Sequence, residues 1–439
     1  MSIAYGSIIA FLFRGLNILI ALATVVVTSN SLGVDGRGVF VLGATAVGIV
    51  TAVSGGLTAA VAYQVANQRR KPGDVLANGE LIAGSVGVVA IAIGIAGGSV
   101  FAGEASRVSL AVGAASAAVI VNGVLAGVYL GNDSLVRYNV CLVAPPLLAA
   151  IGIVSVIFVA GERTPEAALG AYAAGQWAAT PILVALGGWR MVLAGVSFER
   201  TLTRRMVTFA LMAGLSSAIS YLNYRADTFV VDHFKGQSGV AVYSNAVYIA
   251  ESLWQFSGSI ALAAYARLGA LDREDAAELT TRVMRHTLIV LLAVCTALFI
   301  FADIIVDLLF SPEYHAMAGA LRILLPGTLL FGMAAAFSGF FVYNRGKPWI
   351  SAVVAGVGLI VDMILCFVLI PSMGVDGAAT ASAVAYAVAI VAALIVFVYD
   401  TKMSPVRIFK FTRADIDDYR VLIGRLRDAW SRRGALSSQ

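Results

Sequence analysis

The stretch ISAVVAGVGLIVDMILCFVLIP, Ile350 to Pro371, decides the class of fold. Nearly every side chain is apolar, and a helix of this length crosses the hydrocarbon core of a bilayer. Similar runs recur along the 439 residues, of which 60% are hydrophobic and 13% charged, whereas a soluble domain carries about 25% charged residues. A β-barrel would instead show short segments of alternating hydrophobicity. The sequence therefore predicts an all-α polytopic membrane protein.

Twelve transmembrane helices are expected, joined by short loops that leave no room for a large soluble domain. The first apolar segment lacks an Ala-x-Ala-like cleavage site behind a basic region, so it is interpreted as a retained helix rather than a signal peptide. The predicted spans are 8–30, 39–66, 80–101, 107–130, 136–160, 168–189, 207–231, 239–265, 286–310, 317–343, 350–371 and 376–399.

The distribution of Lys and Arg sets the expected orientation. The loops after the even-numbered spans, together with the C-terminal tail, carry 23 of the 30 basic residues, and the opposite loops carry 4. By the positive-inside rule, both termini are expected in the cytoplasm, with the protein in the cytoplasmic (inner) membrane. The net charge of +5 is explained by this pattern, so nucleic acid is not expected as a partner.

The chain repeats itself weakly at an offset of 203 residues. GVDGRGVF (33–40) precedes one span and GQSGVAVY (236–243) precedes the span six helices later. A second echo pairs EAALGAYA (166–173) with DGAATASA (376–383). Six helices per half give both halves the same orientation, which predicts two pseudo-symmetric six-helix lobes around a central cavity. The expected division is an N-terminal lobe (1–195), a cytoplasmic linker (196–206), a C-terminal lobe (207–400) and a cytoplasmic tail (401–439).

Charged side chains inside the predicted spans are candidates for function, because an ionisable group at the bilayer centre costs about 2.5–3.5 kcal/mol on insertion scales. In span 8–30, Arg14 and Asn17 share one helical face; Arg14 either faces a cavity or snorkels to the interface. Span 207–231 contains LNYR and Asp227 near its end. Arg225 and Asp227 lie about 200° apart around a helix, so a simple ion pair between them is not expected.

The surroundings of Arg225 allow two interpretations. Tyr side chains next to it are typical of an interfacial belt, but the apolar run continues through Val230 and Val231, which favours a cavity wall. The candidate substrate-binding residues of this segment are Asn223, Tyr224, Arg225 and Asp227.

Span 239–265 carries a polar stripe on one helical face. Its members follow each other at intervals of three and four residues, and Glu251 lies beside them. Exposure of such a stripe to lipid would be costly, which favours a wall of the cavity; hydrogen bonding between helices of one lobe is the alternative. The stripe consists of Asn245, Tyr248, Ser252, Gln255 and Ser259.

The remaining embedded charges lie in the spans 286–310, 317–343 and 350–371. Asp303 and Asp307 share a face near a helix end, where solvation is the expected role, and Arg322 can pair with them. Asp362 has no partner nearby in sequence, so it is either a proton-titrating site or a structural hydrogen-bond acceptor. Asp227, Glu251 and Asp362 are the candidates for proton or ion coupling.

No motif for enzymatic chemistry or a cofactor is evident. P-loop, HExxH, GxSxG and CxxC patterns are absent from the sequence, which excludes an ATP-driven pump with its own motor. The three cysteines, Cys141, Cys295 and Cys366, fall in apolar segments without the spacing of a metal site. A non-enzymatic protein without cofactor or metal is expected.

Three segments carry a family resemblance: LGVDGRGVFVLGATAVG in the second span, YRADTFVVDHFKGQSGVAVYSNAVYIAESLWQFSG, and NRGKPWISAVVAGVGLIVDMILCFVLIPSMGVDGAATASAVAYA. In these segments the chain resembles the polysaccharide flippases of the multidrug/oligosaccharidyl-lipid/polysaccharide exporter (MOP) superfamily, over most of residues 1–400. The resemblance implies alternating access and transfer of undecaprenyl-pyrophosphate-linked oligosaccharide to the outer leaflet. It also implies that Arg14, Arg225, Asp227 and Glu251 line the cavity. Twelve spans, instead of the fourteen of lipid II flippases, argue against the peptidoglycan precursor as substrate.

Two other functions stay open. A cation-coupled multidrug antiporter shares the fold, and fold alone does not settle the substrate. A non-transporting scaffold of a glycan-assembly complex is the third possibility, with a glycan polymerase or glycosyltransferases as partners. The tail supports it, because an apolar face at helical spacing (Ile416, Tyr419, Ile423, Leu426, Trp430) predicts an amphipathic helix on the inner leaflet. The expected partners of the flippase itself are a lipid-linked glycan and membrane lipids.

Overall fold

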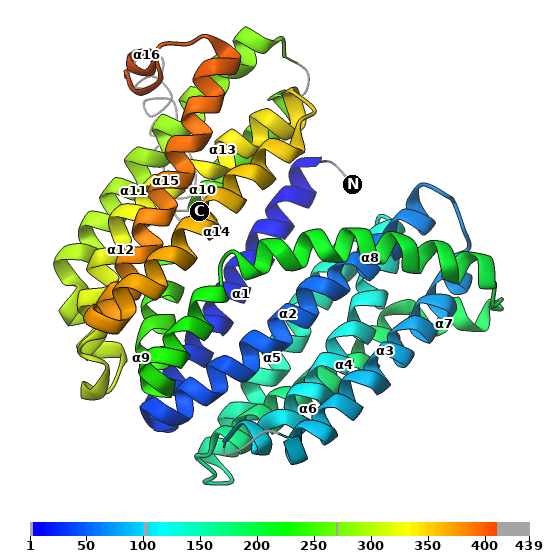
Figure 1. Cartoon of the computed structure of the whole chain (residues 1–439). Helices are drawn as coiled ribbons and strands as arrows, with labels where there is room; N and C mark the ends of the chain where they lie inside the picture. The colour runs from blue at the N-terminus through cyan, green and yellow to red at the C-terminus, as the bar shows by residue number, and fades with distance from the viewer. Residues whose placement is uncertain (1–2, 101–103, 269–270, 411–439) are drawn as a thin grey trace, which may run out of the picture. The chain divides into compact units, whose positions relative to one another are not determined.

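The structure, a computed structural model, describes residues 3–100, 104–268 and 271–410. These residues form helices joined by short connections, and no strand occurs among them (Figure 1). Eleven of the described helices are long and apolar enough to cross a membrane. The predicted all-α polytopic fold is confirmed.

The helices group into two compact units that are described separately. The first comprises Met1–Ile249, Phe301–Leu324 and Leu359–Ser382, and the second comprises Ala250–Ile300, Leu325–Gly358 and Ala383–Gln439. The two predicted six-helix lobes stay a prediction. The helices up to residue 222 are α1 (Ile3–Ser31), α2 (Gly33–Ala66), α3 (Pro72–Val100), α4 (Glu104–Gly131), α5 (Leu135–Phe158), α6 (Pro165–Leu183), the π-helical turn η1 (Val184–Gly188), α7 (Trp189–Leu193) and α8 (Arg200–Leu222).

Helices α1 to α8 pack through small residues. Helix α4 contacts α2, α3 and α6, while α5 contacts α6 and α1, and α2 contacts α8. Gly56 of α2 and Gly214 of α8 illustrate why: a Cβ at Gly214 would meet the carbonyl oxygen of Val53 in α2. Since lipid supplies no hydrophobic drive between helices, close approach at small residues is the main source of such packing.

The polar segment around Arg225 breaks its helix. Helix α8 ends at Leu222, and residues 223–225 form a turn before α9 (Ala226–Ser252). Gly236, at φ +65° and ψ −166°, then interrupts α9, and Leu253 separates α9 from α10 (Trp254–Leu268). The predicted continuous helices 207–231 and 239–265 are therefore wrong in detail, because each contains a break.

The rest of the chain is also helical. Two short helices, α13 and the π-helical turn η3, follow α12 directly in the sequence. The elements are α11 (Arg273–Leu309), the 3-10 turn η2 (Pro312–Tyr314), α12 (Met317–Phe331), α13 (Ala334–Gly339), η3 (Phe340–Asn344), α14 (Pro348–Met373), α15 (Val375–Thr401) and α16 (Pro405–Phe409).

The second unit is held by aromatic packing and by an ionic cluster. Phe397 lies between Phe337 and Phe340, with ring centroids 5.3 and 5.0 Å apart. Asp400, at the end of α15, accepts a hydrogen bond from Arg345 at 2.9 Å and forms ion pairs with Arg273 at 3.6 Å and Lys347 at 3.8 Å. Arg285, 2% exposed, donates to the carbonyl oxygen of Ile408 at 3.2 Å and so holds α16. The predicted amphipathic helix of the tail, 416–430, lies outside the described residues.

The glycines of the predicted repeat have matching conformations. Gly33 at the start of α2 and Gly236 within α9, the first residues of the two repeat segments, have φ of +69° and +65°. Gly374 before α15, outside the predicted repeat segments, also has φ of +65°. L-residues rarely adopt this region, so glycine is required at each turn into the following helix. The conformations agree with the internal echo seen in the sequence.

Candidate substrate pocket

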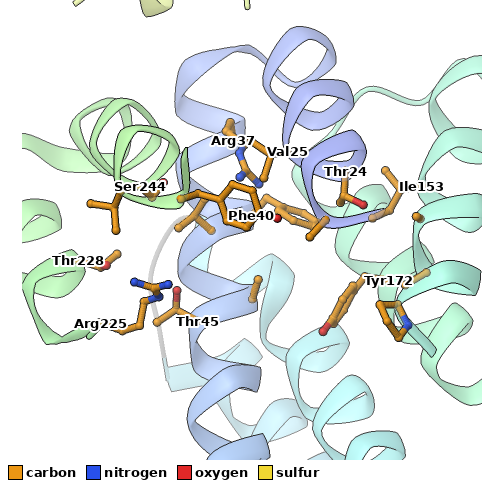
Figure 2. A pocket seen from close by; sticks show the side chains of 18 of the residues that line it. Thr24, Val25, Arg37, Phe40, Thr45, Ile153, Tyr172, Arg225, Thr228 and Ser244 are labelled. Atoms are coloured by element: carbon orange, nitrogen blue, oxygen red, sulfur yellow. The ribbon is translucent and has the colours of Figure 1, made fainter. Parts of the chain in front are cut away.

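The first unit contains a pocket of about 270 Å³. Its walls come from α1, α2, α5 and α6, from the end of α8 and the turn after it, and from α9 (Figure 2). The lining includes two arginines, Arg37 and Arg225, and no Asp or Glu side chain. The pocket is therefore a cationic cavity inside a largely apolar helix assembly.

Arg37 is the more deeply buried of the two cations, at 5% exposure in the first turns of α2. Its Nη2 and Nε donate to Oδ1 of Asn245 at 3.1 and 3.4 Å, and its guanidinium lies 5.5 Å from the centroid of the Phe40 ring. The Nδ2 of Asn245 donates to Oγ of Ser29 at 2.8 Å. Asn245 thus links the ends of α1 and α2 to α9.

The charge of Arg37 is not neutralised by a nearby tyrosinate. Tyr314, in the turn between α11 and α12, lies close enough to interact with Arg37 electrostatically, but burial raises the pKa of Tyr314 to about 12. A cation near a helix N-terminus is also disfavoured by the helix dipole. Helix stability therefore does not explain Arg37, and an anionic ligand would.

Arg225 faces the same pocket from the turn that follows α8. Its Nη1 donates to the carbonyl oxygen of Tyr224 at 2.7 Å, and in Figure 2 its guanidinium lies near Thr45 of α2 and Thr228 of α9. The N-terminal end of α9 follows this turn, and there the carboxylate of Asp227 already accepts from the backbone nitrogen of Thr228. The break in the helix thus supplies the pocket with the guanidinium of Arg225.

Aromatic and hydroxyl groups complete the lining. Tyr172, Tyr221, Tyr243 and Tyr248 all contribute, together with threonine and serine side chains. Gly48 of α2 is needed for this arrangement, because a Cβ there would overlap the hydroxyl of Tyr221. These groups can donate to phosphate or sugar oxygens.

Four buried side chains form a chain of hydrogen bonds beside the pocket. The hydroxyl of Tyr243 donates to Oδ2 of Asp227 and lies 2.8 Å from Oγ of Ser382, which donates to Oδ1 of Asp362 at 3.0 Å. The four side chains are between 1% and 6% exposed. Asp227 also accepts from the backbone nitrogen of Thr228 at 2.7 Å. Two carboxyl groups from different helices, α9 and α14, are thus joined through two hydroxyls.

The hydrogens of this chain can be counted. It has three oxygen–oxygen contacts, and the hydroxyls of Tyr243 and Ser382 supply one hydrogen each. The third contact needs a hydrogen from one of the carboxyl groups. The arrangement is therefore complete when Asp227 or Asp362 carries a proton, and it has one contact without a hydrogen when both are ionised.

The structure gathers some of the predicted site residues and separates others. Arg225 and Tyr248 line the pocket, while Asn245 and Asp227 lie directly behind it through Arg37 and Tyr243. The other predicted site residues are not in its lining. Arg14 on α1 and Gln255 on α10 are exposed, whereas Asn17, Asn223 and Tyr224 are half-buried. Glu251 lies in the second unit, where it accepts from the hydroxyl of Tyr386 at 2.8 Å.

The break at Leu253 divides the predicted polar stripe, so its five members do not lie along one continuous helix. The structure shows partners for the other embedded charges. Arg322 pairs with both oxygens of Asp303 at 2.9 and 2.5 Å, and Asp307 pairs with His315 at 3.1 Å instead. Asp362 accepts a hydrogen bond from the hydroxyl of Ser382. Among the residues that the structure describes, no group of three potential metal ligands occurs.

Sequence reasoning missed Arg37, which it assigned to an outer loop. Because α2 begins at Gly33 rather than at residue 39, Arg37 lies one turn inside the helix. A signal was present: the same GVDGRGVF motif that marks the repeat carries an arginine directly before a long apolar run.

Comparison with known proteins shows a family and a fold. A model of the family described as "Lipid II flippase MurJ" matches residues 133–417. An uncharacterized membrane protein of Methanocaldococcus jannaschii, MJ1068, is 25% identical over 197 residues, which are 44% of this chain. The match spans only 38% of that protein's own length.

Solved structures of transporters share the architecture. Lipid II flippase MurJ in an inward closed conformation superposes with a TM-score of 0.73 at 12% identity, over 92% of this chain and 89% of that one. An inward-facing multidrug resistance MATE family transporter gives 0.69 at 19% identity, over 89% and 94%. A MOP superfamily transporter from Pyrococcus furiosus gives 0.64 at 18% identity, over 90% and 94%. At these identities the likeness shows the fold alone.

Proposed function

Because the chain belongs to the Lipid II flippase MurJ family, we propose that it is a flippase for undecaprenyl-pyrophosphate-linked oligosaccharide. It moves this lipid from the inner to the outer leaflet of the cytoplasmic membrane by alternating access. The observation that carries the proposal is the pocket with two guanidinium groups and no carboxylate in its lining. The resemblance to polysaccharide flippases with twelve spans supports a glycan other than the peptidoglycan precursor.

The pyrophosphate is the part of the substrate that fits this pocket. Guanidinium groups form paired hydrogen bonds with phosphate oxygens, and Arg37 and Arg225 approach from different helices. A volume of about 270 Å³ is below the range of about 300–1,000 Å³ that drug-sized ligands occupy. The oligosaccharide therefore lies outside the pocket, where Asn223, Tyr224 and Gln255 stay candidates for sugar contacts, and the lipid tail stays in the bilayer. Arg14 and Asn17 remain candidates on α1.

Binding of the pyrophosphate would act on a helix contact. Asn245 takes two donors of Arg37 and also binds Ser29. A phosphate that draws the guanidinium of Arg37 competes with Asn245 and weakens the link between α1, α2 and α9. In this proposal the substrate itself loosens the contact that must open for alternating access.

Proton coupling is assigned to the hydrogen-bonded chain from Asp227 to Asp362. The chain is complete with one carboxyl proton and incomplete without it, so its proton content affects how firmly α9 holds α14 and α15. Glu251, in the second unit, is the other candidate. An imposed proton gradient is expected to drive flipping.

The test is substitution of the two pocket arginines. Flipping of a fluorescent pyrophosphate-linked glycolipid is measured in proteoliposomes. Since a hydrogen bond to a charged group contributes about 1.5–3 kcal/mol, Arg37→Ala and Arg225→Ala should each raise the substrate concentration for half-maximal flipping by about 10- to 100-fold. Arg163→Ala, which removes an exposed arginine between α5 and α6, is the matched control. Unchanged flipping in both pocket variants would remove the proposed role.

A cation-coupled multidrug antiporter is the second candidate, since MATE transporters share the fold. A cationic drug would be repelled by the two arginines in the described lining of this pocket, which has no acidic side chain to offset them. Export of cationic dyes by the wild type, with no flipping of the glycolipid, would reverse the ranking.

A further inference from the structure

A second cavity, of about 470 Å³, lies in the first unit at a different place from the substrate pocket. The connection between α2 and α3, the start of α5, and the segment around α7 meet there. Its lining carries three basic side chains, Lys71, Arg137 and Arg190, and no acidic side chain. The positive-inside pattern places these three connections on the cytoplasmic side.

The charges of this cavity are not balanced by the surrounding chain. Within the described residues, none of the three basic side chains pairs with a carboxylate. Two nearby acidic residues are engaged elsewhere: Asp74 accepts from the backbone nitrogen of Ser197 at 2.6 Å, and Glu199 pairs with Arg70 at 3.2 Å. Asp133, four residues before Arg137, is exposed and is not part of the cavity lining. Three like charges around one cavity repel each other, and an anion would relieve the repulsion.

The position of the Arg137 head group is defined by its surroundings. The guanidinium lies 5.9 Å from the centroid of the Tyr129 ring, and Tyr129 is fixed by donating to the carbonyl oxygen of Leu183 at 2.7 Å. On the other side is Gly187, at φ +145°, where a Cβ would stand 3.0 Å from Nη1 of Arg137. The π-helical turn η1 therefore makes room for this guanidinium at the cavity.

Exposed apolar side chains lie next in sequence to the lining residues Arg190 and Ala194, although they are not part of the lining itself. Arg190 stacks on Trp189 at 5.1 Å, and Trp189 is 44% exposed. Leu193 and Phe198, further along the same segment, are 76% and 66% exposed. Tryptophan beside basic residues is typical of the membrane interface. A soluble anion would make no contact with these apolar side chains, whereas the acyl chains of a lipid could pack against them.

We propose that this cavity binds the phosphate of an anionic phospholipid headgroup, with the acyl chains against Trp189, Leu193 and Phe198. The occupant is a phospholipid of the cytoplasmic leaflet, where anionic lipids attract basic residues near the surface. The site is independent of the flipped substrate, and Arg37 and Arg225 play no part in it.

A bound lipid would hold the segment that leads to α8. This segment is already fixed to α3 by Asn78, whose Nδ2 donates to the carbonyl oxygen of Ser197 at 2.8 Å and whose Oδ1 accepts from the nitrogen of Glu199 at 3.1 Å. A phosphate that bridges Lys71, Arg137 and Arg190 adds a second fixation of the same segment at its start. Anionic lipid is therefore expected to stabilise the folded protein against heat.

The test measures lipid binding by the full-length protein purified in a neutral detergent. Short-chain phosphatidylglycerol and phosphatidylcholine are titrated separately, and bound lipid is counted by native mass spectrometry. Each basic side chain that contacts the lipid phosphate directly is expected to strengthen binding about five-fold, so the triple variant Lys71→Gln, Arg137→Gln, Arg190→Gln should bind phosphatidylglycerol about 100-fold more weakly. The control variant Arg200→Gln, Arg204→Gln, Arg205→Gln removes three exposed charges nearby and should bind like the wild type.

Three results would overturn the proposal: equal binding by the triple variant and the wild type, equal affinity for phosphatidylcholine and phosphatidylglycerol, or the same thermal stabilisation by inorganic phosphate, which would identify a soluble ligand. If the triple variant does not fold, Arg190→Gln replaces it. Arg190 is exposed and its guanidinium stacks on Trp189, so this variant removes no buried side chain and should bind about five-fold more weakly. An unchanged affinity in Arg190→Gln would also count against the site.

Discussion

Replacement of Tyr243 by Phe removes one oxygen from the chain between Asp227 and Asp362. Tyr243 is 1% exposed, so water does not replace the lost hydroxyl. The hydrogen bond to Asp227 is of the charged class, which contributes about 1.5–3 kcal/mol, and the contact with Ser382 is of the neutral class at about 1 kcal/mol. Asp227 keeps the backbone donor of Thr228 at 2.7 Å, which limits the loss. We expect the free energy of unfolding to fall by about 2–3 kcal/mol.

The same substitution should uncouple transport from the proton gradient. Without the hydroxyl, Tyr243 no longer links Asp227 to Ser382 and Asp362, so a proton cannot pass between the two carboxyl groups through this side chain. Unfolding is measured in mixed micelles, and flipping is measured in proteoliposomes with and without an imposed pH gradient. Tyr243→Phe should flip at the same rate with and without the gradient, whatever that rate is relative to the wild type.

Tyr129→Phe is the matched control for this experiment. Tyr129 is also fully buried, and its hydroxyl donates to a neutral carbonyl, that of Leu183, at 2.7 Å. Its loss should cost only about 1 kcal/mol and leave the stimulation by the gradient intact. Full stimulation in Tyr243→Phe, or an equal loss in Tyr129→Phe, would refute the reasoning about the hydrogen-bonded chain.

Two further substitutions test contacts within each unit. Gly38→Ala places a Cβ against the backbone carbonyl of Gln237, so α2 and α9 must separate at a cost of about 1–3 kcal/mol; Gly55→Ala on the same helix meets no atom within 4 Å and should be neutral or slightly stabilising in the same unfolding assay. Asp400→Asn removes the anion from its three basic partners and should lower the free energy of unfolding by about 2 kcal/mol, whereas Glu274→Gln, at an exposed position of α11, should change it by less than about 0.5 kcal/mol.

The class of fold could be predicted because hydropathy acts through length and composition. A run of about 20 apolar residues has one stable state in a bilayer, a helix with all backbone groups bonded internally. Hydropathy does not predict the breaks at residues 223–225 and at Leu253. Mean hydropathy over about 20 residues is hardly changed by one non-helical turn, so it does not reveal a break. The backbone groups freed at a break are satisfied by neighbouring helices, which lie elsewhere in the sequence.

The candidate site shows the same limit at the level of single residues. The cost of burying a charge identified Arg225, Asp227 and Asp362 one by one, since that cost is a property of each side chain. What each charge does depends on partners far away in sequence. Asp362 meets Ser382 on the next helix, and the link to Asp227 passes through Tyr243, which the sequence offers only as one more aromatic residue of an apolar helix.

Arg37 is the clearest case of a residue whose function depends on a helix boundary. Glycines and charges in GVDGRGVF favour a loop by local propensity, and a loop arginine is solvated and unremarkable. The structure instead begins α2 at Gly33, whose φ of +69° permits the turn directly into the helix. Arg37 is thereby buried against Asn245, at a cost that the bond to one neutral amide does not offset. Binding of an anionic ligand at the pocket wall would compensate this cost. The arginine substitutions therefore test the proposed function directly.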